Sequence, residues 1–279
     1  RVKEQQLKRT AADLVQAQEE ERRRVAYEIH DGLAQVLVGT YQRLQAYSER
    51  PGPRPAAAKA ELHQVISELK PDLAVVVAYG RLIPAETLAL ARLGFLNVHF
   101  SLLPKYRGAA PVQWSLVRGE KKTGVSLFWL DEGMDTGPIQ ATVETEIGGD
   151  EDAPALLARL TKLGVELLDS SLTDLTAGKV IRIPQEGVPS AAPLIKREDA
   201  RLDMARPADE LHGLVRGFRS WPRAWLELAS GKVLVLKTEA ASPSDIIGNG
   251  PPGTVLAIER GRGILVQCSS RSRLWFLEV

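Results

Sequence analysis

The segments LNVHFSLLPKYRG, residues 96–108, and TGVSLFWLDEGMDTG, residues 123–137, decide the fold of this chain. Each segment begins as an apolar strand and ends as a polar loop, and residues 111–118 between them have the composition of a short helix. Alternating strands and helices predict an open α/β sheet. Because ligands of such sheets bind at the carboxyl ends of the strands, we expect a functional site in these two loops.

The flanking segments extend the predicted sheet. Residues 73–78, LAVVVA, form a continuous apolar run that is typical of a strand buried on both faces, as in a parallel sheet. Residues 139–147 are strand-like, and residues 152–176 form a long amphipathic helix followed by Gly178. These elements predict an open α/β sheet within residues 60–184.

The composition changes after Pro184. Residues 185–200 are a connector rich in Gly, Pro, Ala and Ser, and residues 207–218 predict a helix. Several short strands separated by turns are typical of a small barrel, so residues 201–279 are predicted to form a C-terminal, OB-like β-barrel domain. The strand candidates are residues 224–228, 232–237, 253–258, 264–268 and 274–277.

Residues 1–50 predict one long N-terminal helix, and the Pro-rich residues 51–59 a linker. Apolar or neutral residues recur at spacings of three and four from Val25 to Tyr47, as in a helix that packs against a partner helix. Residues 21–35, ERRRVAYEIHDGLAQ, resemble the dimerisation and phosphoacceptor helix of two-component sensor kinases. The resemblance implies a homodimer and makes His30 a possible phosphoacceptor, but nothing downstream resembles the ATP-binding domain of such a kinase.

The bulk composition is that of an ordinary globular protein, with 44% hydrophobic and 25% charged residues. The net charge of +1 indicates that any nucleic-acid contact is made by a local basic patch. The single cysteine, Cys268, excludes an intramolecular disulfide framework and favours a reducing, cytoplasmic location. No apolar run is long enough to span a membrane. The scattered histidines show no metal-ligand spacing, so we expect no metal.

The polar loops carry the groups that acyl transfer to an amine requires. Such a reaction passes through a tetrahedral oxyanion, which needs a hydrogen-bond donor, and it needs a base for the amine proton. Asn97 offers an amide donor, and His99 projects from the same strand face. Asp135 is the nearest strong carboxylate candidate after the next strand, and a carboxylate beside His99 would favour the protonated imidazole.

From about residue 60 to residue 279, the chain resembles methionyl-tRNA formyltransferases. The resemblance rests on Asn97, His99 and Asp135 together with the segments 108–111 (GAAP), 200–203 (ARLD) and 221–225 (WPRAW). It implies transfer of a formyl group from 10-formyltetrahydrofolate to the amino group of initiator methionyl-tRNA, a step of translation initiation, with those three residues catalytic. It also implies folate contacts from Ser101, Leu102, Leu103, Pro104, Gly80, Arg81, Leu82, Ile83, Leu130, Asp131 and Met134. The implied tRNA contacts are Lys196, Arg197, Arg216, Arg219 and Arg223, with Arg260 and Arg262 as further basic candidates.

The chain departs from that family before residue 56. The family carries further strand–helix units at this point, including a basic loop that reaches the tRNA, whereas here the kinase-like helix occupies the position. The resemblance therefore implies that residues 60–184 form a partial Rossmann-like sheet, and we expect an apolar strand edge at residues 73–78. Two alternatives stay open, namely an inactive or hybrid protein whose helix is a dimerisation module, and a formyltransferase for another amine such as an amino sugar.

Overall fold

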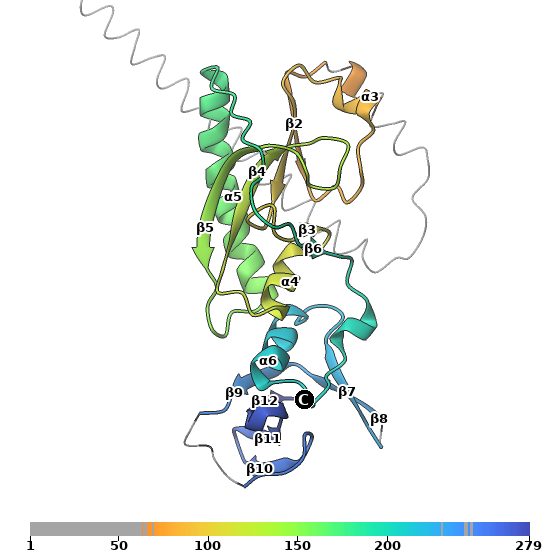
Figure 1. The fold of residues 1–279 in the computed structure, drawn as a ribbon, viewed down its shortest axis with the longest axis vertical. Coiled ribbons are helices and arrows are strands. Elements are labelled where there is room, and N and C mark those ends of the chain that lie inside the picture. The colour runs from red at the N-terminus through yellow and green to blue at the C-terminus, as the bar shows by residue number, and fades with distance from the viewer. Residues whose placement is uncertain (1–62, 64–65, 69, 230, 243–244, 246–247) are drawn as a thin grey trace, which may run out of the picture.

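The computed structural model describes residues 63, 66–68, 70–229, 231–242, 245 and 248–279. Figure 1 shows a sheet-containing part and a C-terminal part joined end to end, with α4 and α6 at their junction. The predicted helix 1–50, the linker 51–59 and His30 lie outside the described residues. None of the described helices has the length and apolar character needed to cross a membrane.

The larger described sheet has the strand order β1-β2-β4-β5. Strands β1 (Leu73–Val77) and β2 (Gly94–His99) are parallel. Strands β4 (Lys122–Trp129) and β5 (Ile139–Glu146) continue the sheet in antiparallel fashion, and His99 pairs with Ser126. The sheet is therefore mixed rather than parallel. The reason is the connection: a parallel crossover usually requires a long helix, and α4 (Pro111–Val117) has only 7 residues.

One face of this sheet is covered by α5 (Ala153–Thr176), which follows β5. Leu156 and Leu160 of α5 are fully buried and belong to one core cluster with Leu96 and Val98 of β2. Asp152 caps the helix by accepting a hydrogen bond from the backbone N–H of Ala155 at 3.0 Å. Since Leu96 and Val98 face α5, the alternating residues Asn97 and His99 face away from it.

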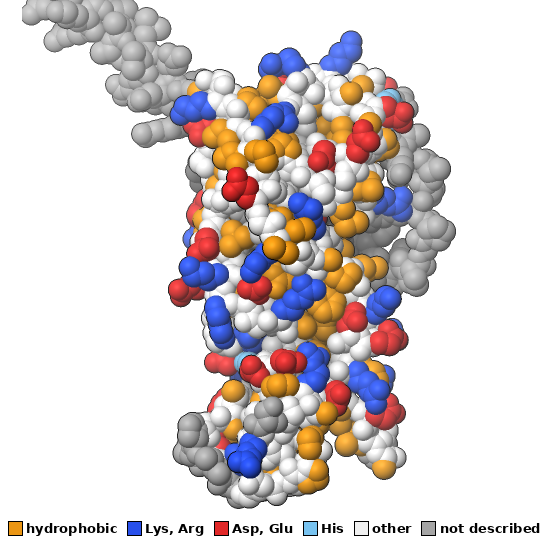
Figure 2. All heavy atoms as spheres, viewed as in Figure 1, with side chains coloured by type: hydrophobic (Ala, Val, Ile, Leu, Met, Phe, Trp, Pro, Cys, Tyr) orange, Lys and Arg blue, Asp and Glu red, His pale blue; other side chains and the backbone are white. Residues whose placement is uncertain are grey.

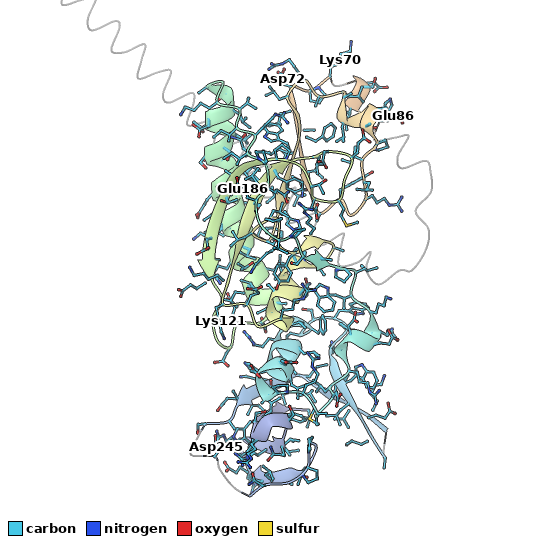
Figure 3. The ribbon with its side chains drawn as sticks, in the orientation of Figure 1. Lys70, Asp72, Glu86, Lys121, Glu186 and Asp245 are labelled. Carbon is cyan, nitrogen blue, oxygen red and sulfur yellow. The ribbon has the colours of Figure 1, made fainter. Side chains whose placement is uncertain are left out.

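Strand β1 is less buried than its sequence predicts. All 5 of its residues are half-buried, because β1 pairs only with β2 among the described strands and stands at the edge of the described sheet. Its neighbour on the other sheet face is a smaller core cluster that contains Ile83 and Phe95. Helix α3 (Ala85–Leu88) lies beyond this cluster, at the end of the molecule where Figure 3 labels Lys70, Asp72 and Glu86.

The C-terminal part consists of antiparallel strands and one helix, α6 (Ala208–Gly217). The four-stranded sheet has the order β10-β11-β12-β9, and β7 and β8 form a separate hairpin. The small antiparallel β domain is thus confirmed, although its described strands pair as two sheets and not as one closed ring. The strand bounds are β7 Ala224–Leu228, β8 Gly231–Val235, β9 Lys237–Ala240, β10 Val255–Glu259, β11 Gly263–Gln267 and β12 Arg273–Glu278.

The two parts are joined by close packing of α6 against α4. A Cβ atom added at Gly213 would lie 2.6 Å from the carbonyl oxygen of Leu116, so only glycine allows this approach. The rings of Trp114 and Phe218 meet edge to face with their centroids 5.8 Å apart. In the connector, Ala191 and Ala192 (β6) pair in parallel with Arg107 and Gly108 (β3), which follow β2. The loop after β2 therefore touches the connector that leads to the C-terminal part.

Candidate active site

The site is built around the carboxyl end of β2. Asn97 and His99 are two residues apart on this strand and share the sheet face opposite α5. Asn97 is half-buried, and its amide has no hydrogen-bond partner among the described residues, so both amide protons are available. Only 6% of the His99 side chain is exposed.

The two ring nitrogens of His99 have different surroundings. Nε2 lies 2.9 Å from the carbonyl oxygen of Tyr106, and Nδ1 lies 3.7 Å from Oδ2 of Asp135. A carbonyl oxygen only accepts hydrogen bonds, so we assign the proton of the neutral ring to Nε2. The lone pair of Nδ1 then faces the Asp135 side of the site, where it can accept a proton.

Burial decides the charge of His99. Removal from water lowers the pKa of the imidazole below its ordinary value, and the nearby charge of Asp135 and the Tyr106 carbonyl oppose this effect without outweighing it. The direction of this pKa shift is opposite to the one expected from the sequence, which was toward a protonated imidazole. That expectation considered only the attraction of the carboxylate, and it could not include the desolvation of a side chain with 6% exposure.

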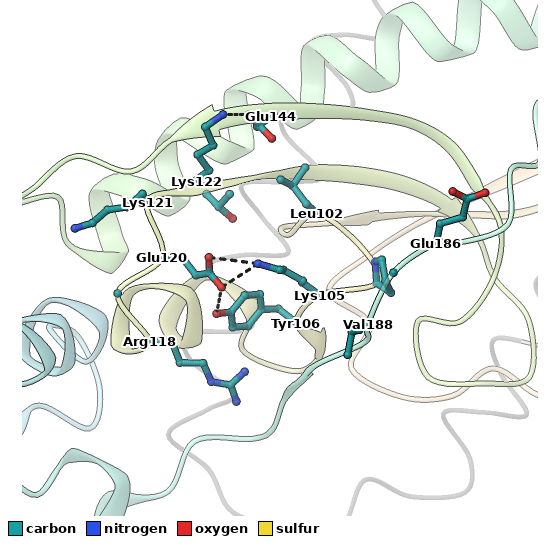
Figure 4. Close-up of a pocket in the computed structure, with 14 residues that line it drawn as sticks. Leu102, Lys105, Tyr106, Arg118, Glu120, Lys121, Lys122, Glu144, Glu186 and Val188 are labelled. Carbon is teal, nitrogen blue, oxygen red and sulfur yellow. Dashed lines mark hydrogen bonds and ion pairs between the residues drawn. The ribbon is translucent and has the colours of Figure 1, made fainter.

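Tyr106 is held so that its carbonyl meets His99. Its phenol is buried and donates to Oε1 of Glu120 at 2.8 Å, while Lys105 lies 3.3 Å from the same oxygen (Figure 4). Burial and the Glu120 carboxylate raise the pKa of the phenol. The backbone of Tyr106 has φ +60°, a left-handed conformation that is uncommon for a residue with a side chain. The surrounding contacts maintain this conformation and with it the orientation of the carbonyl.

Asp135 reaches the site from a long loop. Because β2 and β4 are antiparallel, Trp129 at the end of β4 pairs with Leu96, three residues before His99. The carboxyl ends of β2 and β4 therefore lie at opposite ends of this strand pair. Loop 130–138 instead folds back, and Asp135 adopts φ +53°. Its Oδ2 accepts a hydrogen bond from the backbone N–H of Gly108 at 2.7 Å.

The loop that carries Asp135 is braced internally. Oδ1 of Asp131 accepts from the backbone N–H of Gly133 at 3.0 Å and from the hydroxyl of Thr136 at 2.6 Å. A Cβ atom added at Gly137 would lie 1.7 Å from the carbonyl oxygen of Trp129. These contacts make the turn tight enough to return toward β2. Asp131, an expected folate contact, thus also has a structural role.

The segment Ser101–Pro104 follows β2 shortly after His99 and is held in place by hydrogen bonds. Ser101 is fully buried, and its hydroxyl donates to the carbonyl oxygen of Lys105 at 2.7 Å. Ser126 of β4 donates to the carbonyl oxygen of Ser101 at 2.7 Å and accepts from the backbone N–H of Leu103 at 3.1 Å. The Ser101 hydroxyl is therefore committed to the fold. Leu102 and Pro104 line a cavity of about 710 Å³ together with Lys105, Tyr106 and Glu186 (Figure 4).

Loops 80–83 and 130–134 meet on the β1 side of the sheet. Leu130 packs against the core cluster of Ile83 and Phe95, and its backbone N–H donates to the carbonyl oxygen of Phe95 at 2.8 Å. The two remaining apolar side chains point to solvent, with Leu82 exposed to 52% and Met134 to 59%. Gly80 has φ +70°, and Arg81 is exposed. The fold brings these predicted residues together and leaves two apolar side chains uncovered.

The basic candidates fall into two groups. Lys196, Arg197 and Arg223 are exposed and form no ion pair within the described residues. Arg216 instead donates to the carbonyl oxygens of Gly148 and Glu151, each at 3.1 Å, and burial lowers its pKa. Of the other basic candidates, Arg260 is exposed like the first group. Arg219 is engaged like Arg216, since it contacts Leu236 and Glu278. Arg262 is also engaged, through contacts with Asp245 and Glu239.

Two connector residues in the site were not predicted. The side chain of Gln185 bonds to the backbone of Asp135 and Gly137, and Ser190 bonds to Tyr106 and Arg107. Both lie more than 40 residues from their partners, for example 50 between Gln185 and Asp135. No local sequence pattern marks such a contact. In the described part of the chain, no cluster of His, Cys, Asp or Glu is arranged to hold a metal ion.

Comparison with known proteins defines the class of this two-part α/β chain. The family model described as "Formyl transferase" matches residues 13–172, and the model described as "Formyl transferase, C-terminal domain" matches residues 194–279. The chain therefore belongs to the formyl transferase family. The first match begins inside the predicted N-terminal helix, so the domain boundary at residue 60 stays a prediction.

Curated relatives are about two fifths identical to this chain over the residues that align. The methionyl-tRNA formyltransferase of Geobacter metallireducens is 40% identical over 208 residues, which are 74% of this chain and 65% of the relative. That of Geobacter sulfurreducens is 42% identical over 210 residues, or 75% and 64%. The chain thus spans just under two thirds of the length of these relatives.

Solved structures share the fold. HypX from Aquifex aeolicus in complex with tetrahydrofolic acid matches with a TM-score of 0.60 and 22% identity, over 77% of this chain and 37% of that one. A likely sugar N-formyltransferase from Mycobacterium tuberculosis matches with a TM-score of 0.55 and 26% identity, over 67% and 81%. At 22% identity, the first likeness shows the fold alone.

Proposed function

We propose that this protein transfers a formyl group from 10-formyltetrahydrofolate to the α-amino group of methionyl-tRNA in translation initiation. The observation that carries the proposal is the convergence of Asn97, His99 and Asp135, with Nδ1 of His99 3.7 Å from Oδ2 of Asp135. The relatives with 40% and 42% identity support the tRNA acceptor, since both are methionyl-tRNA formyltransferases.

The proposed chemistry follows from the state of each side chain. The substrate amine attacks the formyl carbon, and the oxyanion that forms accepts a hydrogen bond from the free amide of Asn97. The amine proton passes to Nδ1 of neutral His99, which then returns it to N10 of the folate as the old C–N bond breaks. Asp135 stabilises the transient imidazolium. The products are formylated methionyl-tRNA and tetrahydrofolate.

The proposed folate site extends from His99 toward loops 80–83 and 130–134. Leu82 and Met134 are exposed apolar side chains on these loops, and an aromatic ring system would cover them. Ser101, Leu102, Leu103 and Pro104 would contact the folate mainly through backbone and apolar atoms, because the Ser101 hydroxyl is already bonded. Gly80, Arg81, Ile83, Leu130 and Asp131 complete the proposed set.

The proposed tRNA surface consists of the basic candidates whose side chains are exposed. Lys196, Arg197 and Arg223 are free to meet phosphates, whereas Arg216 and Arg219 are engaged with backbone carbonyls. Figure 2 shows acidic and basic side chains interspersed on the face in view, in keeping with the net charge of +1. We propose contacts from individual residues near the connector, not from a broad basic face.

Formylation of charged initiator tRNA in the presence of 10-formyltetrahydrofolate tests the proposal. We expect turnover by the wild-type chain and its loss in Asp135→Ala. A wild-type rate no higher than that of the variant would overturn it. The same assay with a nucleotide-linked amino sugar tests the second acceptor class, which the match to a likely sugar N-formyltransferase favours. Preference for the sugar would replace the tRNA assignment.

We further propose that residues 1–50 form a sensor-kinase-like helix that makes the chain a homodimer. The support is the repeat from Val25 to Tyr47 and the likeness of residues 21–35. Sedimentation of the full chain should show a dimer, and a strict monomer at high concentration would contradict it. Labelling of His30 by a separate kinase domain should disappear in His30→Gln.

We also propose a cytoplasmic location, supported by the lone Cys268 and testable by cell fractionation.

A further inference from the structure

Both the nitrogen and the oxygen of the Gln185 side-chain amide form hydrogen bonds with the loops that form the site. Nε2 donates to the carbonyl oxygens of Asp135 and Gly137, both at 2.8 Å. Oε1 accepts from Nη2 of Arg107 at 2.6 Å and from Nε of Arg107 at 3.2 Å. One half-buried amide from the connector thus makes four hydrogen bonds, and no hydrogen-bonding atom of the group is left over.

These bonds fall where the backbone needs support. Asp135 has φ +53°, a left-handed conformation that a residue with a side chain keeps only where the surrounding structure holds it. Gly108 holds the carboxylate of Asp135, and Gln185 holds the carbonyl of the same residue. Arg107 is the neighbour of Gly108 in the chain. Gln185 therefore links the loop of the carboxylate to the segment that carries its hydrogen-bond donor.

The same stretch of connector also supports the histidine. The backbone N–H of Tyr106 donates to the hydroxyl of Ser190 at 2.9 Å, and that of Arg107 donates to the carbonyl oxygen of Ser190 at 2.8 Å. Tyr106 in turn accepts from His99. Residues 185–192, which we call the strap, therefore contact the supports of both His99 and Asp135. Beyond the strap, the chain continues directly into the C-terminal part.

We propose that Gln185 is a positioning residue that keeps the carboxylate of Asp135 beside Nδ1 of His99. Its importance for catalysis rests on the function proposed above. The geometry requires an amide, because two carbonyl oxygens need donors and a guanidinium needs an acceptor on one side chain. A carboxylate at this position would satisfy Arg107 but would face two carbonyl oxygens without a proton to donate.

The test compares Gln185→Glu and Gln185→Met with the same changes at Gln113. Gln113 is half-buried on α4 and makes no side-chain hydrogen bond within the described residues, so it is a matched control. We expect each Gln185 variant to lose about 10- to 100-fold in kcat with little change in KM, as for a displaced catalytic group. The ratio of Gln185→Glu to wild-type kcat should rise as pH falls, because a protonated glutamate regains one donor.

A second readout does not depend on activity. In Gln185→Met, Asp135 should move away from His99, and NMR titration of the imidazole should show a lower pKa than in the wild type, since the charge of Asp135 raises it. Equal His99 pKa values in the wild type and Gln185→Met would overturn the proposal. So would a ratio of Gln185→Glu to wild-type kcat that does not change with pH. If the wild type itself transferred no formyl group, the proposed function would fail while the NMR titration still tested the positioning.

Discussion

The backbone N–H of Gly108 donates to Oδ2 of Asp135 at 2.7 Å, across 27 residues of sequence. The bond joins the loop after β2 to the loop after β4, which the antiparallel pairing of these strands would otherwise separate. Two features of the structure require glycine at position 108. Its φ of +120° excludes other residues without strain, and a Cβ atom there would lie 2.7 Å from the carbonyl oxygen of Ala192.

Replacement of Asp135 by asparagine should remove catalysis and leave the fold intact. The asparagine oxygen can still accept from Gly108, but it carries no charge to stabilise the imidazolium of His99. We expect kcat for formyl transfer to fall about 10²- to 10⁴-fold, the usual share of general acid–base catalysis. Thermal unfolding of the same variant is the control and should stay near that of the wild type. A kcat within twofold of wild type would contradict the proposed role.

Gly108→Ala should destabilise the chain itself. The added methyl group meets the backbone of Ala192, which is fully buried in the β3–β6 pair and cannot move aside. Overpacking of this kind costs about 1–3 kcal/mol in free energy of unfolding, before the strain of the positive φ is added. Gly149→Ala is the matched control, because a Cβ atom added at Gly149 would meet nothing within 4 Å and its φ is not positive. Equal urea midpoints for the two variants would show that the close contact is not rigid.

The pH dependence of kcat/KM should show that His99 works as a neutral base. Burial lowers its pKa from the ordinary value of 6.5, so the neutral form persists in the substrate-free protein below that pH. We expect the acid limb of the kcat/KM profile to have its midpoint below 6.5. The His99→Gln variant should lose this limb together with most activity. A midpoint above 6.5 would indicate that the carboxylate outweighs burial.

His212 should make the protein less stable in acid. It is buried at the junction, where Nδ1 lies 2.9 Å from the hydroxyl of Thr238. Burial, and next the charge of Arg216, lower its pKa below 6.5, so the folded state binds fewer protons than the unfolded state. Its contribution is therefore complete above pH 6.5 and is lost as pH falls through the lowered pKa of the folded state. In His212→Gln, the free energy of unfolding should fall less steeply over this range, and an unchanged slope would contradict it.

The exposed basic residues near the connector should affect tRNA binding through charge alone. For Lys196→Ala and Arg197→Ala, the slope of log K for tRNA against log salt concentration should become shallower by about 1 per lost phosphate contact. Thermal stability should change little, because neither side chain forms an ion pair within the described residues. Arg216→Ala is the contrasting variant. It should lower stability, since its guanidinium bonds Gly148 and Glu151 across the junction. Unchanged salt slopes would show that Lys196 and Arg197 do not contact tRNA phosphates.

Local patterns were sufficient to place most of the described elements. The apolar run at residues 73–78, the segment 96–100 and the amphipathic helix after Asp152 all correspond to observed elements, because strand and helix periodicities are properties of adjacent residues. The partnership of Asn97 and His99 was predictable for the same reason, since residues two apart on a strand share a face. The antiparallel placement of β4 was not, because strand direction depends on how the connection between β2 and β4 packs.

The sequence alone therefore determined the residue types of the site, their order, and the membership of the chain in a class of α/β transferases with an antiparallel C-terminal part. Only the tertiary structure decided that loop 130–138 folds back to bring Oδ2 of Asp135 to 3.7 Å from Nδ1 of His99, and that burial lowers the pKa of the imidazole. It also decided that Gln185 and Ser190 of the strap support both residues. Desolvation and contacts across 50 or 84 residues arise only when distant segments pack together, and no neighbouring residue in the sequence reports them.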